Sequence, residues 1–219
     1  MAVNCGVAYG LCAARVTELD DEGNAEGSFA VSRNPVSVAF NPNIDQGQQF
    51  ISRNGCGCAI ARIRSNDVFN WFELTFAQEA LQPELETLLV DGETPILDGA
   101  DIVGANGGSQ LDCDEDPRTV GFEMWARHYV GSGQDSIHRF VHWVFPRSRW
   151  QRGNNTVQEG IARTNITGFS QTNQLWGSGP YGDGPPDGQD VTEWAYWKSN
   201  DDMPTAVTCG DLGTVTPGS

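Results

Sequence analysis

Two cysteines separated by a single glycine are the residues of this sequence whose type and spacing could most directly do chemistry. Cys56 and Cys58 lie in the segment RNGCGC, which looks like half of a metal or redox site. A structural zinc ion needs four ligands, usually from two cysteine pairs of wider spacing. The other cysteines, at positions 5, 12, 113 and 209, form no second close pair. We therefore interpret the segment as a turn between two strands and expect no metal site and no cofactor.

Histidines and acidic residues could also bind a metal ion. His138 and His142 fall on one face of an expected strand, and Asp135 or Glu123 could supply a carboxylate. Because this ligand set is sparse, we expect ordinary histidines of a β surface or an interface. The acidic segment LDCDEDPR, residues 111–118, lacks the glycine and the distal glutamate of an EF-hand loop, which favours a solvated loop.

No recognisable motif predicts catalysis. No serine lies in a G-x-S-x-G turn, and no phosphate-binding glycine motif is present. Because nothing assembles a nucleophile, a base and an oxyanion site, we expect that the chain is not an enzyme.

Seven tryptophans keep a carbohydrate-binding function open as an alternative. Trp194 and Trp197 are the pair that could form a surface platform for sugar rings. Trp71, Trp125 and Trp143 lie in alternating strands instead, where aromatic side chains usually fill cores or subunit interfaces.

The charge balance restricts the partners of the chain. Its 219 residues include 13 basic and 29 acidic side chains, which give a formal net charge of −16. Binding to nucleic acid or to an anionic membrane requires basic residues, so neither partner is expected. No apolar run approaches the roughly 18 to 20 residues of a membrane span, and no signal peptide is evident. We therefore expect synthesis in a cytoplasm, where the cysteines are at first reduced.

Short runs rich in Val, Ile, Phe, Trp and Thr, punctuated by Gly and Asn, predict a mainly β protein. We expect one domain over residues 1–204 and a loosely held tail over residues 205–219. The expected strands cover residues 36–40, 48–52, 59–64, 69–76, 96–97, 119–130, 137–145, 156–169 and 191–197.

One helix is expected at about residues 80–91. Pro83 suits its first turn and Gly92 its end. Leucines recur at helical spacing and form a single apolar stripe. The stripe consists of Leu81, Leu85, Leu88 and Leu89.

The order of several motifs resembles one family, the major tail tube subunit of long-tailed, non-contractile phages, particularly those that infect actinobacteria. The matching segments are CGVAYGLC (5–12), VSVAFNPNIDQGQQFISRNGCGC (36–58), WFELTFAQEALQPELETLLVDGETPILDGADIVG (71–104) and Cys209-Gly210. Residues 1–104 carry most of the likeness, and the later half agrees in strand pattern and length. The chain departs from the family around residues 62–66, where the family usually has another cysteine.

This resemblance implies a tail-tube fold, similar to a β-sandwich or barrel, with the leucine stripe of the helix packed on the inner sheet. It implies a structural virion protein, made in the host cytoplasm and located in the tail. Six copies would form a ring whose inner sheets join into one barrel. Stacked rings would form a tube that conducts double-stranded DNA without binding it. The implied partners are further copies, the tape measure protein and the tail terminator.

A tail terminator or a tail-tip protein of related fold is the alternative within the same resemblance. Such a protein would form a single ring, whereas tube subunits stack in large numbers. The copy number in the particle therefore distinguishes the two functions.

The segment between residues 41 and 58 is where we expect contact with the next ring. It is long for a simple hairpin and polar at its turn, which favours a projecting loop. The expected contact residues are Asn43, Asp45, Gln46, Gln48, Gln49 and Arg53. The candidate thiols for a disulfide or an interface are Cys5, Cys12, Cys56 and Cys58.

Overall fold

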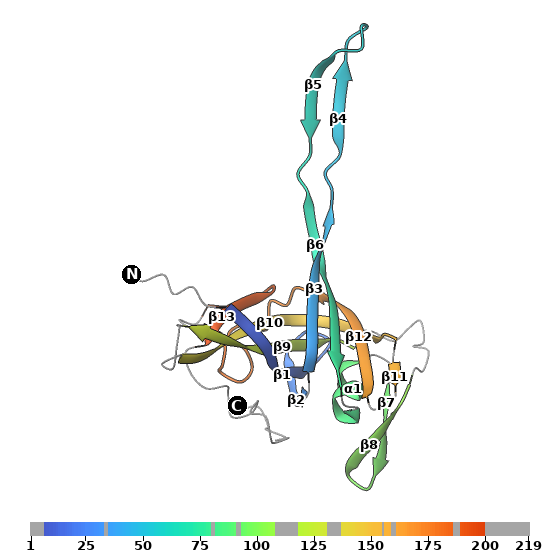
Figure 1. Ribbon diagram of the computed structural model, residues 1–219, viewed down its shortest axis with the longest axis vertical. Coiled ribbons are helices and arrows are strands. Elements are labelled where there is room, and N and C mark those ends of the chain that lie inside the picture. Colours follow the sequence, from blue (N-terminus) through green and yellow to red (C-terminus); the bar gives the residue numbers. More distant parts are fainter. Residues whose placement is uncertain are drawn as a thin grey trace.

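A curled antiparallel sheet with two protruding hairpins dominates the protein, shown in Figure 1 as a computed structural model. The structure describes residues 7–32, 35–79, 82–90, 93–107, 118–130, 137–154, 156–158, 161–185 and 189–199. The expected tail at residues 205–219 lies outside these ranges. The described part is mainly β, as the sequence predicts.

The main sheet contains nine strands, and two further strand pairs form separate hairpins. The strands of the sheet are β1 (Val7–Leu19), β2 (Ala25–Ser32), β3 (Pro35–Asp45), β6 (Val68–Gln78), β9 (Val120–Val130), β10 (Ile137–Arg152), β11 (Thr156–Gln158), β12 (Ile161–Gln171) and β13 (Ala195–Ser199). The hairpins pair β4 (Gln49–Arg53) with β5 (Ala59–Arg64) and β7 (Thr94–Asp98) with β8 (Asp101–Asn106).

The central strands of the sheet follow the order β2-β1-β9-β10-β12-β6-β3. The long strand β10 pairs with β13 along its first half and with β12 along its second half. Its register with β9 breaks between Phe145 and Ser148, where Pro146 has no N–H to give to the ladder. This break lets the sheet turn, so that β3 and β6 run across the direction of β10 (Figure 1).

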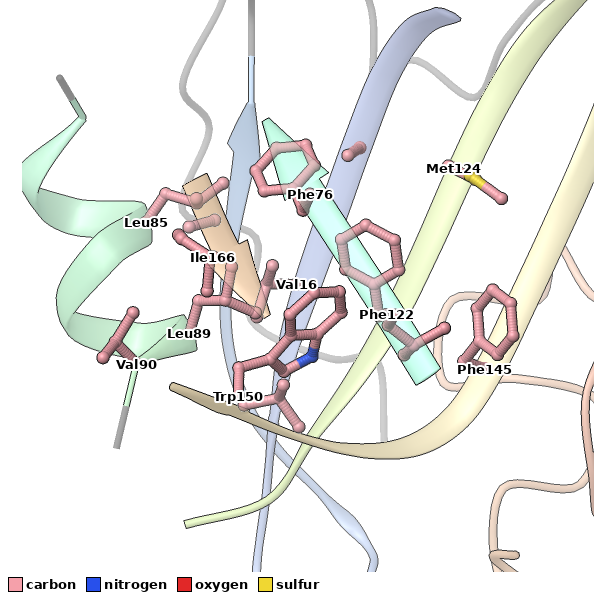
Figure 2. Packing of buried hydrophobic residues seen from close by; sticks show 14 of the residues in the cluster. Val16, Phe76, Leu85, Leu89, Val90, Phe122, Met124, Phe145, Trp150 and Ile166 are labelled. Atoms are coloured by element: carbon pink, nitrogen blue, oxygen red, sulfur yellow. The ribbon is translucent and has the colours of Figure 1, made fainter. Parts of the chain in front are cut away.

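One apolar core fills the inside of the curl (Figure 2). Strand alternation selects its members. On β9, Phe122 and Met124 enter the core, whereas Glu123 and Trp125 are buried on the opposite face. Other residues buried in the core are Val16, Leu74, Phe76, Phe145, Trp150 and Ile166.

The helix α1 (Pro83–Leu89) packs on this core. Leu85 and Leu89 are buried in the core cluster, and Leu88 is partly buried against it. Figure 2 shows Leu85 and Leu89 pointing from the helix toward Ile166 and Trp150.

The helix is shorter than the expected range of about 80–91. Pro83 occupies its first turn, with Glu84 and Glu86 near the positive helix start. It ends before Val90, whose extended backbone forms a parallel bridge with Trp150. Leu81, the first member of the expected stripe, lies outside the described residues.

The opposite face of β1, β9 and β10 is covered by the segment 172–194, which the sequence predicts only as a loop. Trp176 and Val191 of this segment are buried against Leu19 and Val144 of the sheet. The Asn173 side chain donates from Nδ2 to two backbone carbonyl oxygens, of Gly23 at 2.8 Å and of Pro146 at 3.1 Å. We call the described residues 172–185 and 189–193 the cover, because they form a layer on this face of the sheet.

Replacing Gly121 with alanine is expected to loosen the cover. A Cβ atom at this position would lie 2.2 Å from Cζ3 of Trp176, so the indole ring must move. Overpacking of this kind costs about 1–3 kcal/mol. Urea unfolding followed by tryptophan fluorescence would measure the loss of stability. Gly55→Ala is the matched control, because its Cβ would meet no atom within 4 Å. Equal unfolding midpoints for both variants would contradict this packing.

Several strands differ from the expected set. β1, β2 and β8 are not among the expected strands, and the last expected strand, residues 191–197, is found as β13 at 195–199. β1 shows no alternation of apolar and polar residues that would predict a strand, because both of its faces are buried from Ala13 to Thr17. Val191 belongs to the cover, since its N–H donates to the Gly177 carbonyl.

Candidate functional site

The most exposed feature of the molecule is a hairpin arm, residues 46–67, that extends β3 and β6 away from the body (Figure 1). β3 and β6 remain paired as far as Asp45 and Val68. After a short interruption, β4 and β5 continue the hairpin. Every residue of β4 and β5 is exposed, so nothing in the described part of the chain covers the arm.

A close backbone approach fixes the base of the arm. A Cβ at Gly47 would lie 1.8 Å from the Ser65 carbonyl oxygen, so only glycine fits there. The Gly47 N–H donates to Asp67 Oδ1 at 2.8 Å, and Arg64 forms an ion pair with the same carboxylate at 2.9 Å. The Gly47 hydrogen bond and the nearby Arg64 charge lower the pKa of Asp67 below its ordinary value.

The segment RNGCGC forms the tip of the arm, as a turn between the two strands. The Asn54 side-chain Oδ1 accepts hydrogen bonds from the backbone N–H groups of Cys56 and Cys58, at 3.1 and 2.9 Å. Gly57 has a φ of +81°, which glycine adopts without strain. Arg53 donates to the Gly57 carbonyl oxygen at 2.8 Å. The glycine and the asparagine therefore shape the tip, and both thiols are exposed.

The arm has one apolar and one basic face. Phe50 lies opposite Ile63 in the β4–β5 register, and these side chains are 60% and 66% exposed. Residues directly opposite each other share a face, and alternate residues point the other way. The second face therefore carries Arg53, Arg62 and Arg64 together with the exposed Ile51, which lies opposite Arg62. An apolar face exposed in this way is typical of a surface that binds another protein.

The charge of the arm differs from that of the whole chain. Residues 49–64 contain three of the 13 basic side chains and none of the 29 acidic ones. The arm is therefore a positive segment of a strongly negative protein. Electrostatic attraction would steer it toward an acidic protein surface.

The expected contact residues all lie on the arm or at its junction with the body. Gln46, Gln48, Gln49 and Arg53 belong to the arm, and Asp45 ends β3 beside it. Asn43 lies nearer the body, where its side chain donates to Glu73 Oε1 at 3.1 Å and accepts from Asn70 at 3.0 Å.

Sequence reasoning missed the other half of the arm. It named the polar positions of the first strand and omitted Phe50, Arg62, Ile63 and Arg64. The signal was present in AIARIR, where apolar and basic residues alternate with the period of a strand.

Among the candidate thiols, Cys12 lies in β1 with its Sγ 3.7 Å from the Gly10 carbonyl oxygen. It is half-buried in the body, whereas Cys56 and Cys58 are exposed at the arm tip. Cys5 lies outside the described residues, so its pairing stays a prediction.

A second cluster of charged residues is buried between the sheet and the cover. Arg15 contacts both oxygens of Glu123, at 2.7 and 2.8 Å, and Oδ2 of Asp183 at 2.8 Å. Its guanidinium lies 5.1 Å from the Trp125 ring and 3.9 Å from the Tyr181 ring. Because Tyr181 and Asp183 belong to the cover, Arg15 ties the cover to the sheet.

Burial and charge act in opposite directions on the two carboxyl groups of this cluster. Burial alone would raise the pKa of Glu123, but Arg15 and His142 outweigh it and lower that pKa to about 2. Burial and the neighbouring Glu123 charge raise the pKa of Asp183 despite its contact with Arg15. Glu123 is therefore the carboxylate that Arg15 chiefly stabilises.

This cluster contains His142 and Glu123, two of the residues that the sequence analysis considered as metal ligands and did not favour. His142 Nε2 lies 3.1 Å from Glu123 Oε1, and its ring stacks on Trp125 with centroids 4.2 Å apart. Glu123 is engaged by Arg15, and the side chain of His138 lies outside the described part. Within the described residues, no group of three or more His, Cys, Asp or Glu side chains could hold a metal ion.

Trp194 and Trp197, the pair considered for the alternative of sugar binding, pack in different clusters. Trp194 packs against the main core and stacks on Trp143, with planes 11° apart. Trp197 packs in the cluster under the cover, where its ring contacts His142 at 4.3 Å between centroids. The two side chains enter different clusters, so neither offers the other a shared exposed face.

Comparison of the chain with protein-family models, curated proteins and solved structures gives no match. In the part of the chain that the structure describes, no helix is long and apolar enough to cross a membrane.

Proposed function

We propose that this chain is a structural subunit that assembles with copies of itself through the arm, as the major tail tube subunit of a long-tailed, non-contractile phage. The observation that carries the proposal is the arm itself. A lone two-stranded hairpin is at best marginally stable in water, and this one exposes four large apolar side chains, Phe50, Ile51, Ile60 and Ile63. Covering these side chains in an assembly would stabilise the arm.

The proposed tube has six copies per ring and rings stacked through the arms. The sheet supports lateral assembly, because β2 and β3 end its order within the described residues. Strand edges of this kind are removed when neighbouring copies continue the sheet into a closed barrel. The inner sheets of six copies would line the tube, with α1 on their outer side.

The charge of the chain supports a conduit for DNA. Six copies at −16 each would carry about 100 negative charges per ring. A DNA-binding surface needs basic residues that replace phosphate counterions, and this chain has an excess of acids. Double-stranded DNA would therefore pass without being held. The tape measure protein and the tail terminator are the further partners in this proposal, and the virion tail is the location.

Sedimentation velocity across a range of protein concentrations tests this function. We expect the purified chain to form ring-sized species and, at higher concentration, longer stacks with no upper limit set by the chain itself. Rings that never stack would favour the alternative of a tail terminator or tail-tip protein. A monomer at every concentration would contradict self-assembly.

A further inference from the structure

We propose that the β7–β8 hairpin is the docking site for the arm of the next copy. This inference rests on the proposed function and names the partner surface of the arm. In Figure 1 the arm and the β7–β8 hairpin protrude from opposite ends of the longest axis of the molecule. A contact between opposite ends joins unlike surfaces and leaves one of each free, so it repeats without closing. That is the geometry a stacked tube requires.

The β7–β8 hairpin exposes apolar side chains at its own end of the molecule. Ile96, Leu97 and Val103 are all exposed. Because Ile96 and Leu97 are successive residues of β7, these side chains lie on both faces of the hairpin and offer apolar contacts to Phe50 and Ile63 of the arm.

The turn of the β7–β8 hairpin carries unpaired negative charge. Asp98 lies directly opposite Asp101 in the register, on either side of a tight turn with Gly99 at a φ of +67°. Like charges in this position repel each other. Neither carboxylate has a hydrogen-bond or ion-pair partner among the described residues. Cations from another copy would relieve this repulsion.

The arm supplies those cations. Arg62 has no ion-pair partner in the described part of the chain, and Arg53 contacts only the Gly57 carbonyl oxygen there. Both arginines lie on the face of the arm that is free of acidic residues. Charge is therefore complementary between the two hairpins, and both expose apolar side chains, which commits the docking site to a second copy of this chain.

Among the described residues, a groove of about 530 Å³ beside the β1–β2 turn is another surface with several acidic side chains. Its acidic side chains are accompanied by basic ones, which reduces its attraction for the arm. The groove is lined by residues that include Glu18, Asp21 and Glu26 together with Arg118, Arg147 and Arg149. The exposed aspartates of the β7–β8 turn have no such neighbours among the described residues.

The β7–β8 hairpin can also transmit the contact to the body. It packs beside α1, whose Leu85 and Leu89 are buried in the core. An arm docked on the β7–β8 hairpin would therefore be connected, through α1, to the core of the body.

Reciprocal charge reversal tests the docking site. We expect Asp98→Arg with Asp101→Arg to raise the concentration needed for stacking at least about tenfold, because like charges then face each other. Arg53→Glu with Arg62→Glu should have the same effect. A chain that carries all four substitutions should regain stacking. The matched control, Asp21→Arg with Glu22→Arg, changes the net charge equally on the exposed β1–β2 turn and should stack like the unmodified chain.

The outcomes separate this inference from the proposed function. Normal stacking of the Asp98→Arg, Asp101→Arg chain, in a protein whose stacking still requires the arm, would overturn the docking site and leave the tube subunit intact. Loss of stacking in the control to the same degree would also overturn it, because net charge would then explain the result. Stacking that survives removal of the whole arm would overturn both proposals.

Discussion

Replacing residues 46–67 with a two-residue Asn-Gly turn is expected to abolish stacking while the body remains folded. Asp45 and Val68 are register partners, so a two-residue hairpin turn can join them directly. The removed segment contributes no residue to the core clusters. Stability should therefore change by no more than about 0.5 kcal/mol. Sedimentation velocity would measure the assembly, and thermal unfolding would measure the stability of the body.

Removing both strands of the arm is necessary, because a deletion of residues 43–53 alone leaves β5 without its partner. A chain that lacks the arm and still forms stacks would contradict the role of the arm. Phe50→Ser with Ile63→Ser provides a finer test, since it keeps the hairpin and removes its apolar face. Leu175→Ser, at a similarly exposed apolar residue of the body, is the control and should leave stacking unchanged.

Arg15→Ala is expected to destabilise the fold by about 3–5 kcal/mol, the largest effect of any single substitution considered for this chain. The substitution leaves Glu123 buried without its counter-ion and breaks the link to Asp183 in the cover. Urea unfolding at neutral pH would measure the loss. Arg62→Ala on the exposed arm is the control, with an expected change of no more than about 0.5 kcal/mol.

The pH dependence of the stability lost in Arg15→Ala shows whether the ion pair with Glu123 is its cause. The folded pKa of Glu123, about 2, lies below its ordinary value of 4.5. Its ionised form therefore stabilises the native protein above about pH 4.5, and this contribution disappears as the pH falls toward 2. In Arg15→Ala, Glu123 can become neutral when acid is added. The stability difference between the two proteins should narrow across this range, and a constant difference would contradict the ion pair as its source.

The fold was predictable where one face of an element is buried and the other exposed. Phe72, Leu74 and Phe76 of β6 show that alternation, and the leucines of α1 show the helical period. The cover was not predictable as structure, because its glycines and prolines have no period. Its order comes from contacts with distant residues, such as Arg15 with Asp183 and Gly121 with Trp176.

The approximate position of the arm was predictable from the sequence, whereas the residue types on its two faces were predicted only in part. A segment too long for a simple hairpin indicated a projection around residues 41–58, whereas the arm spans residues 46–67 and overlaps this segment only in its first half. The choice of polar residues as contacts overlooked that an exposed strand presents two different faces. Phe50 and Ile63 meet on one face only through the β4–β5 register, which depends on the turn at Asn54–Cys58.

Negative-stain electron microscopy of the purified chain, beside the chain without residues 46–67, tests the central claim most directly. The tube-subunit proposal predicts stacked rings of uniform width for the full chain and unstacked species for the chain without its arm. Compact monomers in both samples, or tubes in both, would contradict the claim that this protein assembles through its arm.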